Sequence, residues 1–412
     1  MAILFKINSR SSIVWRRTVY IMFFAQMVSM IGFSSVFPFL PLYVKDLGTT
    51  TAISTDIYAG LAYSGQAFTM MIASPIWGFL ADRWGRKAMV VRSMLGGSVI
   101  LAMMAFVRSA EELVLLRMVQ GMVTGVMGAT NALVAAAVPR SYAGYAMGLM
   151  QVAIGLGLGL GPVIGGFVAD TYGYPAAFFV TGTLLAIAGV VVLIGVEERL
   201  VSKTAAGKNL LGFLNAWRQI VASRPLRLIY SLRFLNQAGR MIFIPILPLF
   251  IMSLLDSPER VNGYTGLVIG SASAATAIFS ILFGRLGDRR GHHPIVVFCL
   301  LLSSISFAIQ SLVTAGWQLL WLQILYGTAL GGTVTGISAL LANATEEGDE
   351  GFVYGLDNSV NSGARMVGPM LGVAVSGWLG IRMVFGAAAL LYLLAGLLAV
   401  AAMAYRKRRS SP

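Results

Sequence analysis

The stretch GFLADRWGRK at 78–87 returns 206 positions later as GRLGDRRGHH at 284–293, with Gly, Asp and Gly at matching places. FPFLPLY at 37–43 likewise returns as IPILPLF at 244–250, and Gly161-Pro162 returns as Gly368-Pro369, each after 207 positions. An offset that changes by one residue over half the chain indicates a sequence of two equal halves. We therefore expect a fold with internal two-fold symmetry.

The composition indicates a membrane protein. Of the 412 residues, 57% are hydrophobic and 11% are charged, and the mean hydropathy is +0.80. A water-facing surface requires more charge, and the apolar runs do not alternate as the strands of a membrane barrel do. About twelve runs reach the length of a membrane-crossing helix. We predict an all-α integral membrane protein with twelve transmembrane helices, in two six-helix bundles related by pseudo-two-fold symmetry.

The expected helices divide the chain into two bundles, 1–196 and 226–412, joined by a polar cytoplasmic linker at 197–225. The spans expected in the first bundle are 18–44, 57–80, 88–107, 112–135, 145–169 and 175–196. Those expected in the second are 226–252, 262–286, 294–314, 317–342, 351–378 and 381–405. A membrane protein of two such halves is typical of transporters, whose substrate site lies between the repeats.

The net charge of +14 is explained by topology. With the amino terminus inside, 22 of the 30 Lys and Arg residues fall on the inner side and four on the outer side. This bias predicts a multi-pass protein of the cell inner membrane with both termini in the cytoplasm. The basic loops then contact anionic membrane lipids, and we expect no nucleic-acid partner.

The segment 78–87 is expected to join the second and third helices. Asp82 stands at the carboxyl end of a helix, where the dipole disfavours an acid, so it needs a positive partner such as Arg83 or the start of another helix. Gly78 permits close packing and Gly85 permits a tight reversal. A basic loop that only obeys topology is the alternative. We predict a conformational latch formed by Gly78, Asp82, Arg83, Gly85, Arg86 and Lys87, with Asp288 in the second half.

At this segment the chain resembles the major facilitator superfamily, and the resemblance extends over essentially all of its length. It implies that Asp82 contacts the start of the eleventh helix, around 351–354, and stabilises the outward-open state. The second copy departs from the family pattern, because His292 and His293 stand where Arg and Lys are expected. The latch at Asp288 is therefore expected to be weaker.

The fourth expected helix carries a polar stripe. Arg117, Gln120, Thr124 and Asn131 follow each other at steps of 3, 4 and 7, which places them on one helix face. A cation in this segment costs about 2.5–3.5 kcal/mol unless it faces a cavity or a partner; an arginine that snorkels to the membrane surface is the alternative. The resemblance associates Arg117, Gln120 and Gly121 with proton-coupled members. The second half has Gln323 at the position of Arg117.

The fifth expected helix is rich in glycine. Such a density of Gly, with one Pro, permits a bend and close approach of a neighbouring helix, and a generic helix-pairing motif is the alternative. The spacing resembles the signature of antiporters in the superfamily, especially drug/proton exporters, and so favours export over uptake. The motif comprises Gly148, Gly157, Gly161, Pro162, Gly165 and Gly166.

In the superfamily, helices 1, 4, 7 and 10 line a central cavity. The resemblance therefore assigns to the substrate cavity Gln26, Arg117, Asn131, Asn236, Arg240 and Tyr326, each of which has helix packing as its alternative role. Asp357 is the acid that falls clearly inside a second-half helix, and with Arg117 it is the candidate for proton coupling. Substrate or Arg365 is expected to tune Asp357. Asp46 is either a substitute proton carrier or simply an exposed acid.

These features predict a secondary-active efflux transporter that exports amphipathic drugs or toxic small molecules in exchange for protons, by alternating access. A narrow-specificity porter of a sugar or other small metabolite is the alternative. We expect no enzyme, because the two histidines are adjacent and no catalytic or metal-binding cluster accompanies them. No phosphate-binding loop is present, so we expect no cofactor and take the proton gradient as the energy source. One chain contains both halves, which predicts a monomer.

Overall fold

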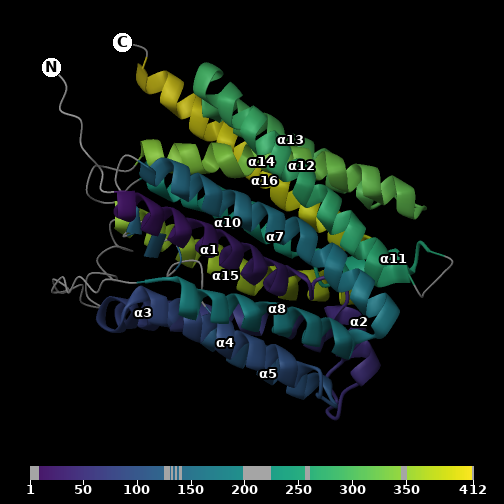
Figure 1. The fold of residues 1–412 in the computed structure, drawn as a ribbon. Helices are drawn as coiled ribbons and strands as arrows, with labels where there is room; N and C mark the ends of the chain where they lie inside the picture. Colours follow the sequence, from purple (N-terminus) through teal and green to yellow (C-terminus); the bar gives the residue numbers. More distant parts are fainter. Residues whose placement is uncertain are drawn as a thin grey trace, which may run out of the picture.

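The computed structural model describes residues 9–124, 130, 133–134, 137–138, 142–197, 224–255, 260–344 and 350–410. Within these ranges the regular elements are helices, without strands, as Figure 1 shows. The first half contains α1 (Ser9–Ser34), α2 (Leu40–Leu47), α3 (Thr55–Trp84), α4 (Arg86–Met104), α5 (Ala110–Val123), α7 (Ala143–Tyr172) and α8 (Tyr174–Gly195). The second contains α10 (Arg224–Met241), α11 (Leu247–Met252), α12 (Val261–Arg290), α13 (His292–Gln310), α14 (Gly316–Asn343), α15 (Glu350–Leu379) and α16 (Met383–Ser410).

The first span of each half is broken, which corrects the continuous helices expected at 18–44 and 226–252. Residues 35–39 separate α1 from α2, and 242–246 separate α10 from α11. Pro38 and Pro245 fall inside these breaks, because proline lacks the N–H that a helix interior needs. Pro41 and Pro248 instead lie in the first turns of α2 and α11, where that N–H would have no partner. The repeated prolines thus produce the same interruption twice.

The helices run back and forth between two ends of the bundle. We call the end where α1 begins and α16 ends the terminal end, and the opposite one, where α2 and α11 lie, the distal end (Figure 1). Loops meet at the distal end, where the Tyr43 hydroxyl donates to the carbonyl of Met104 (3.3 Å) and Arg382 donates to that of Val313 (2.8 Å). The expected linker at 197–225 falls almost entirely outside the described residues.

The main contacts between the two halves are made by two equivalent pairs of helices, and α2 also contacts α11. α7 packs against α12, and α3 packs against α15. Within each half the packing also repeats: α7 contacts α1, and the equivalent α15 contacts α10. In both contacts the backbones approach closely just past the end of the first helix, because a Cβ at Gly165 would overlap the carbonyl of Ser35 and one at Gly372 would overlap that of Ile242. The sequence repeat is therefore a repeat of packing as well.

The outer surface of the bundle is apolar. Large hydrophobic side chains are exposed there, among them Phe106, Phe167, Trp317, Trp321 and Trp378. Such a surface is unsuited to water and suits the hydrocarbon of a bilayer. Seven of the described helices are long and apolar enough to cross a membrane by length and composition. The interior, by contrast, contains buried polar and charged groups.

Candidate transport site

The first half has a polar cluster between α3 and α5. Arg117 of α5 is wholly buried, which contradicts the snorkelling alternative. Its Nη1 donates to Oε1 of Gln120 at 2.7 Å, and Nε2 of Gln66 from α3 donates to the same oxygen at 3.2 Å. The Nε and Nη2 atoms of Arg117 are buried without a hydrogen-bond partner. A buried guanidinium with unused N–H donors can bind an anion or another hydrogen-bond acceptor.

Close packing places this cluster. A Cβ at Gly121 would overlap the carbonyl of Gln66 and the hydroxyl of Thr69, so glycine permits α3 and α5 to meet at backbone distance. Thr69 donates from its hydroxyl to the carbonyl of Met118 at 2.7 Å. Gln66 was not expected in the cluster. Its sequence signal, a polar residue in an otherwise apolar helix, is weak.

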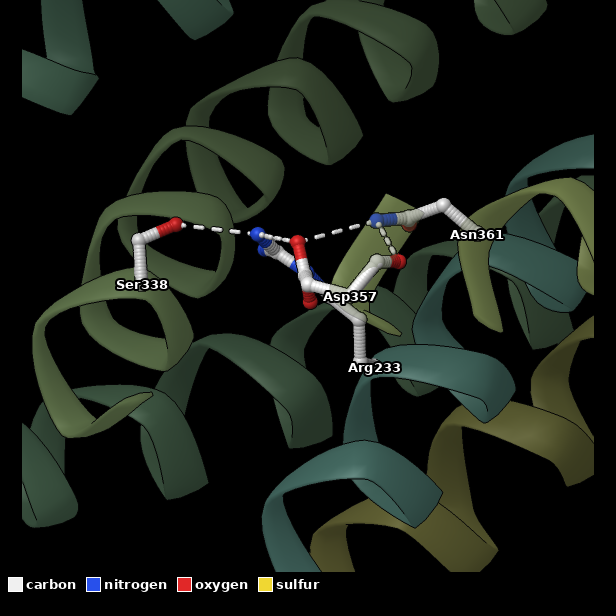
Figure 2. A network of polar contacts seen from close by, with 4 residues as sticks. All are labelled: Arg233, Ser338, Asp357 and Asn361. Atoms are coloured by element: carbon white, nitrogen blue, oxygen red, sulfur yellow. Dashed lines mark hydrogen bonds and ion pairs between the residues drawn. The ribbon is translucent and has the colours of Figure 1, made fainter. Parts of the chain in front are cut away.

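The second half contains an ion pair in which three helices meet. Arg233 of α10 contacts Asp357 of α15 through both carboxylate oxygens, Nε to Oδ1 and Nη2 to Oδ2, each at 2.8 Å. Nη2 also donates to the hydroxyl of Ser338 on α14 at 3.2 Å, and Nδ2 of Asn361 donates to Asp357 Oδ2 at 3.2 Å. Figure 2 shows these four side chains turned toward one another. Asp357 is buried, so this is a desolvated, two-pronged contact.

The partner of Asp357 differs from the sequence prediction. Arg365 was expected to tune this acid, but eight residues of helix separate the two by about 12 Å along the axis. Arg365 instead lies over the ring of Phe33 on α1, 5.9 Å from its centroid, and its Nε is buried without a partner. The pairing with Arg233 could not be found from spacing, because the two residues lie on different helices.

The remaining cavity candidates are buried or half-buried. Both polar side-chain atoms of Gln26 on α1 and Oδ1 of Asn236 on α10 are buried without partners. Arg240 is half-buried and lies within electrostatic range of Tyr326 and Arg365. Unpartnered buried polar groups are rare in folded proteins and are suited to a ligand or to water.

Tyr326 lies inside the second bundle. Its hydroxyl is 2.9 Å from that of Tyr392, which in turn donates to the carbonyl of Asn236 at 3.3 Å. The ring packs against Phe307 with centroids 4.7 Å apart. Through this chain of contacts Tyr326 positions α10 next to α14 and α16, so the packing alternative has direct support at this position. Asn131 falls outside the described residues.

The predicted latch is described in part. Gly78, Asp82 and Arg83 belong to α3, but their side chains, like those of 351–354, are outside the described part, so the contact expected for Asp82 stays a prediction. Gly85 ends the turn with φ of +96°, a conformation that favours glycine. Arg86 and Lys87 begin α4 and are half-buried.

The second copy of the latch makes its contact within its own half. Asp288 is exposed, with 75% of its side chain accessible, and lies 3.3 Å from Nε2 of His292 in the next turn. This contact joins α12 to α13 and does not reach the first half. His292, which stands where the family pattern has a basic residue, thus gives Asp288 a local partner.

The glycine motif shapes two faces of α7. Added Cβ atoms at Gly157 and Gly161 would collide with α1, and one at Gly165 would collide with the residue that follows α1, Ser35. One at Gly166 would collide with the carbonyl of Asn262 on α12. The helix continues through Pro162. A Cβ added at Gly148 would meet no other atom within 4 Å. Helix packing therefore does not require glycine at this position of the motif. The motif lets α7 contact α1 and α12 at once.

Comparison with known proteins identifies the family. The profile of the Major Facilitator Superfamily matches residues 22–232 and 229–412. The chain is 32% identical to the multidrug resistance protein MdtG of Enterobacter lignolyticus over 383 residues, covering 92% of this chain and 90% of the relative. It is 33% identical to MdtG of Serratia proteamaculans over 382 residues, covering 92% of both.

Solved structures share the fold. The nucleoside transporter NupG superimposes with a TM-score of 0.76 at 14% identity, over 92% of this chain and 99% of that one. A bacterial homologue of the human lysosomal transporter Spinster, described as inward-facing and unoccupied, gives a TM-score of 0.75 at 14% identity, over 98% and 99%. The chain therefore belongs to the major facilitator superfamily and is a multi-pass membrane protein with its fold.

Proposed function

We propose that this protein exports drug-like amphipathic compounds by alternating access between its two halves. The observation that carries the proposal is the match to multidrug resistance proteins over 92% of the chain, combined with buried polar groups that have no partner. Gln26, Arg117 and Asn236 supply such groups from α1, α5 and α10. A mixed polar and apolar interior suits amphipathic molecules of varied structure.

Export requires an orientation, which the charge distribution supports. We infer that the terminal end faces the cytoplasm, because most Lys and Arg residues fall on that side. The membrane is then the cell inner membrane, with anionic lipid against the basic loops. The protein works as a monomer in this proposal, since one chain supplies both halves. Crosslinking in native membranes tests this last point, and a predominant dimer would contradict it.

We further propose that protons drive export through the pair of Arg233 and Asp357. A proton that binds the carboxylate removes its charge and leaves the guanidinium buried and unpaired, which is costly. The pair also contacts Ser338 and Asn361, so its rupture loosens the contact among α10, α14 and α15. Proton binding and helix movement are coupled in this way without any cofactor. Within the described residues Arg117 bonds to Gln120 and to no acid, and it is placed to contact substrate.

Transport in proteoliposomes tests the proposal. An imposed pH gradient should drive the movement of at least one compound in a panel of cationic, neutral and acidic amphipathic dyes. The acidic dyes are included because Arg117 and Arg365 carry unpartnered nitrogen atoms. Asp357→Asn should abolish gradient-driven transport while exchange of substrate across the membrane continues. Asp56→Asn, an exposed acid near the distal end, serves as the control.

Each result decides a part of the proposal. Gradient-driven transport that survives Asp357→Asn removes this residue as the proton carrier and turns attention to Asp46. Movement of no dye, together with movement of a sugar or another single metabolite, would favour the narrow-specificity porter instead.

A further inference from the structure

Asp170 lies in the last turn of α7 at the distal end and contacts the first turn of α12, which belongs to the other half. Its Oδ1 accepts hydrogen bonds from the backbone N–H of Asn262 at 3.2 Å and from Nδ2 of the same residue at 2.7 Å. Its Oδ2 accepts from the backbone N–H of Gly263 at 2.5 Å. Both carboxylate oxygens are thus bound by one helical turn across the boundary between the halves.

Among the described residues, the start of α12 has no cap from its own half. Arg260 at the N-cap makes no side-chain capping bond, and the first N–H groups of a helix have no partner within it. A carboxylate is favoured at this place because it accepts those N–H groups and faces the positive end of the helix dipole. Asp170 of the first half therefore caps the first turn of a helix in the second half.

The backbones beneath this cap are in direct contact. A Cβ at Gly266 would overlap the carbonyl of Pro162, and one at Gly166 would overlap that of Asn262. A Cβ at Gly263 would lie 2.8 Å from Oδ2 of Asp170. Because the fit is this close, the hydrogen bonds of Asp170 exist only while α7 and α12 are together at the distal end.

The sequence around Asp170 is another copy of the predicted latch. GFVADTYG at 166–173 matches GFLADRWG at 78–85, 88 positions earlier. Both copies end in a glycine with positive φ, +96° at Gly85 and +84° at Gly173. The copies lie at opposite ends of the bundle, since α3 ends at the terminal end and α7 at the distal end. Each helix packs against a helix of the other half, α3 against α15 and α7 against α12.

The other two copies of this turn make no such contact. Gly291 and Gly380 also have positive φ, +87° and +92°. Asp288 precedes Gly291 but pairs within its own half, and the position equivalent to Asp170 before Gly380 is Gly377, which has open space around it. In the part of the chain that the structure describes, Asp170 is thus the acid of this turn that reaches the other half.

We propose that Asp170 is the positioning residue that stabilises the closed state of the distal end. The predicted latch at Asp82 is the counterpart at the terminal end, and in this proposal the balance between the two sets the population of each state in the transport cycle. The inference rests on the proposed alternating access, but not on the substrate or the coupling ion. It concerns a contact that exists in one state and is broken in the other.

Distances between spin labels in lipid nanodiscs test this balance. Cys299 is the single cysteine, so Cys299→Ala gives a background for labels. Ala52→Cys with Leu312→Cys reports on the distal end, and Glu197→Cys with Arg289→Cys reports on the terminal end; all four positions are exposed. The unsubstituted background is measured first.

Asp170→Asn should raise the population with a long distal distance about tenfold, because charge-assisted hydrogen bonds are lost. Gly263→Ala should shift it in the same direction without any change in charge, because the new Cβ displaces the carboxylate. Asp170→Glu keeps the carboxylate and should restore part of the closed population. Asp82→Asn should shift the terminal pair to longer distances and the distal pair to shorter ones.

Asp56→Asn is the matched control, an exposed acid at the same end whose partner, Lys45, belongs to its own half. It should leave both distributions unchanged. Unchanged distal distances in both Asp170→Asn and Gly263→Ala would overturn the proposal, as would an equal shift in Asp56→Asn. A lower melting temperature without a population shift would assign Asp170 a structural role only. These distances do not depend on drug transport, so failure of the proposed export is seen separately.

Discussion

The two halves share one fold but differ in where they carry charge. The first half has Arg117 at a position where the second has Gln323, and Gln323 makes a neutral bond to Gln310 at 3.0 Å. The second half has the Arg233 and Asp357 pair, whereas the equivalent positions of the first half are Gln26 and Met150. Packing has therefore been retained in both copies while the buried charges have diverged. In the proposed transport cycle, the buried cation of the first half contacts ligand and the ion pair of the second half responds to a proton.

The largest loss of stability is expected when the buried ion pair of the second half is broken. Asp357→Leu leaves Arg233 buried without its partner and should lower the free energy of unfolding by about 3–5 kcal/mol. The double variant Arg233→Met with Asp357→Leu should recover most of that loss, because no unpaired charge remains. Unfolding in mixed detergent micelles measures both. A double variant as unstable as the single one would show that the charge pair is not the source of the effect.

The next largest loss of stability is expected from glycine substitutions that compare the helix packing of the two halves. Gly121→Ala and Gly327→Ala place a Cβ against the carbonyls of Gln66 and Ala272, and each should cost about 1–3 kcal/mol by overpacking. Gly148→Ala, with open space around it, should instead be neutral or stabilising by about 0.5–1 kcal/mol. Thermal unfolding of the three purified variants checks the order. A cost for only one of the first two would mean that the halves pack differently.

A smaller change in stability is expected where the first half is charged. Arg117→Gln makes the first half resemble the second and removes a buried cation with unused donors. The free energy of unfolding should change by about 1 kcal/mol at most, because a desolvation cost and a hydrogen bond to Gln120 are lost together. Transport should nevertheless be lost. Active Arg117→Gln protein would contradict the assignment of Arg117 to the ligand.

The smallest effect concerns pH at the distal end. Burial raises the pKa of Glu111, but hydrogen bonds from its own backbone N–H and from Thr50 outweigh it and lower the pKa to about 2. A carboxyl with a depressed folded pKa contributes stability above its unfolded pKa of about 4.3. That contribution is lost as the pH falls through the folded pKa of about 2.

Hydrogen exchange of the segment 49–51 measures this effect. Its amides should exchange more readily as the pH falls below about 4, once intrinsic exchange rates are corrected for. Glu111→Gln should remove the pH dependence. At the equivalent end of the second half, neutral Gln318 accepts from the backbone N–H of Thr314 at 3.0 Å, and this contact should not respond to acid.

Several elements of the fold were predictable because they depend on local chemistry. Repeated glycines and prolines specified the two halves, and the reversal at Gly85 followed from the conformational freedom of glycine. The interruption of the first and seventh spans was missed, although Pro38 and Pro245 were visible, because apolar length was weighed above the missing N–H. The stripe that contains Arg117 and Gln120 was found from helical period.

The site was less predictable, because its contacts join residues that are far apart in sequence. Asp357 was selected as the candidate for proton coupling from the sequence, because it is an acid within an apolar helix. Its partner Arg233 was not, since Arg365 on the same helix was expected to act on this acid. Gln66 gave no signal strong enough to select it from other polar residues. Asp170 had one, because GFVADTYG at 166–173 repeats the predicted latch, but this copy was missed.

The sequence by itself determined that this is a helical membrane protein of two matching halves, because hydropathy and repeat spacing are properties of the chain. It also determined which residues are costly to bury. Only the tertiary structure decided that Arg233 neutralises Asp357 and that Asp170 caps α12. Such pairings depend on which helix faces meet, and a meeting of faces is set by the packing of the whole bundle and not by any one segment.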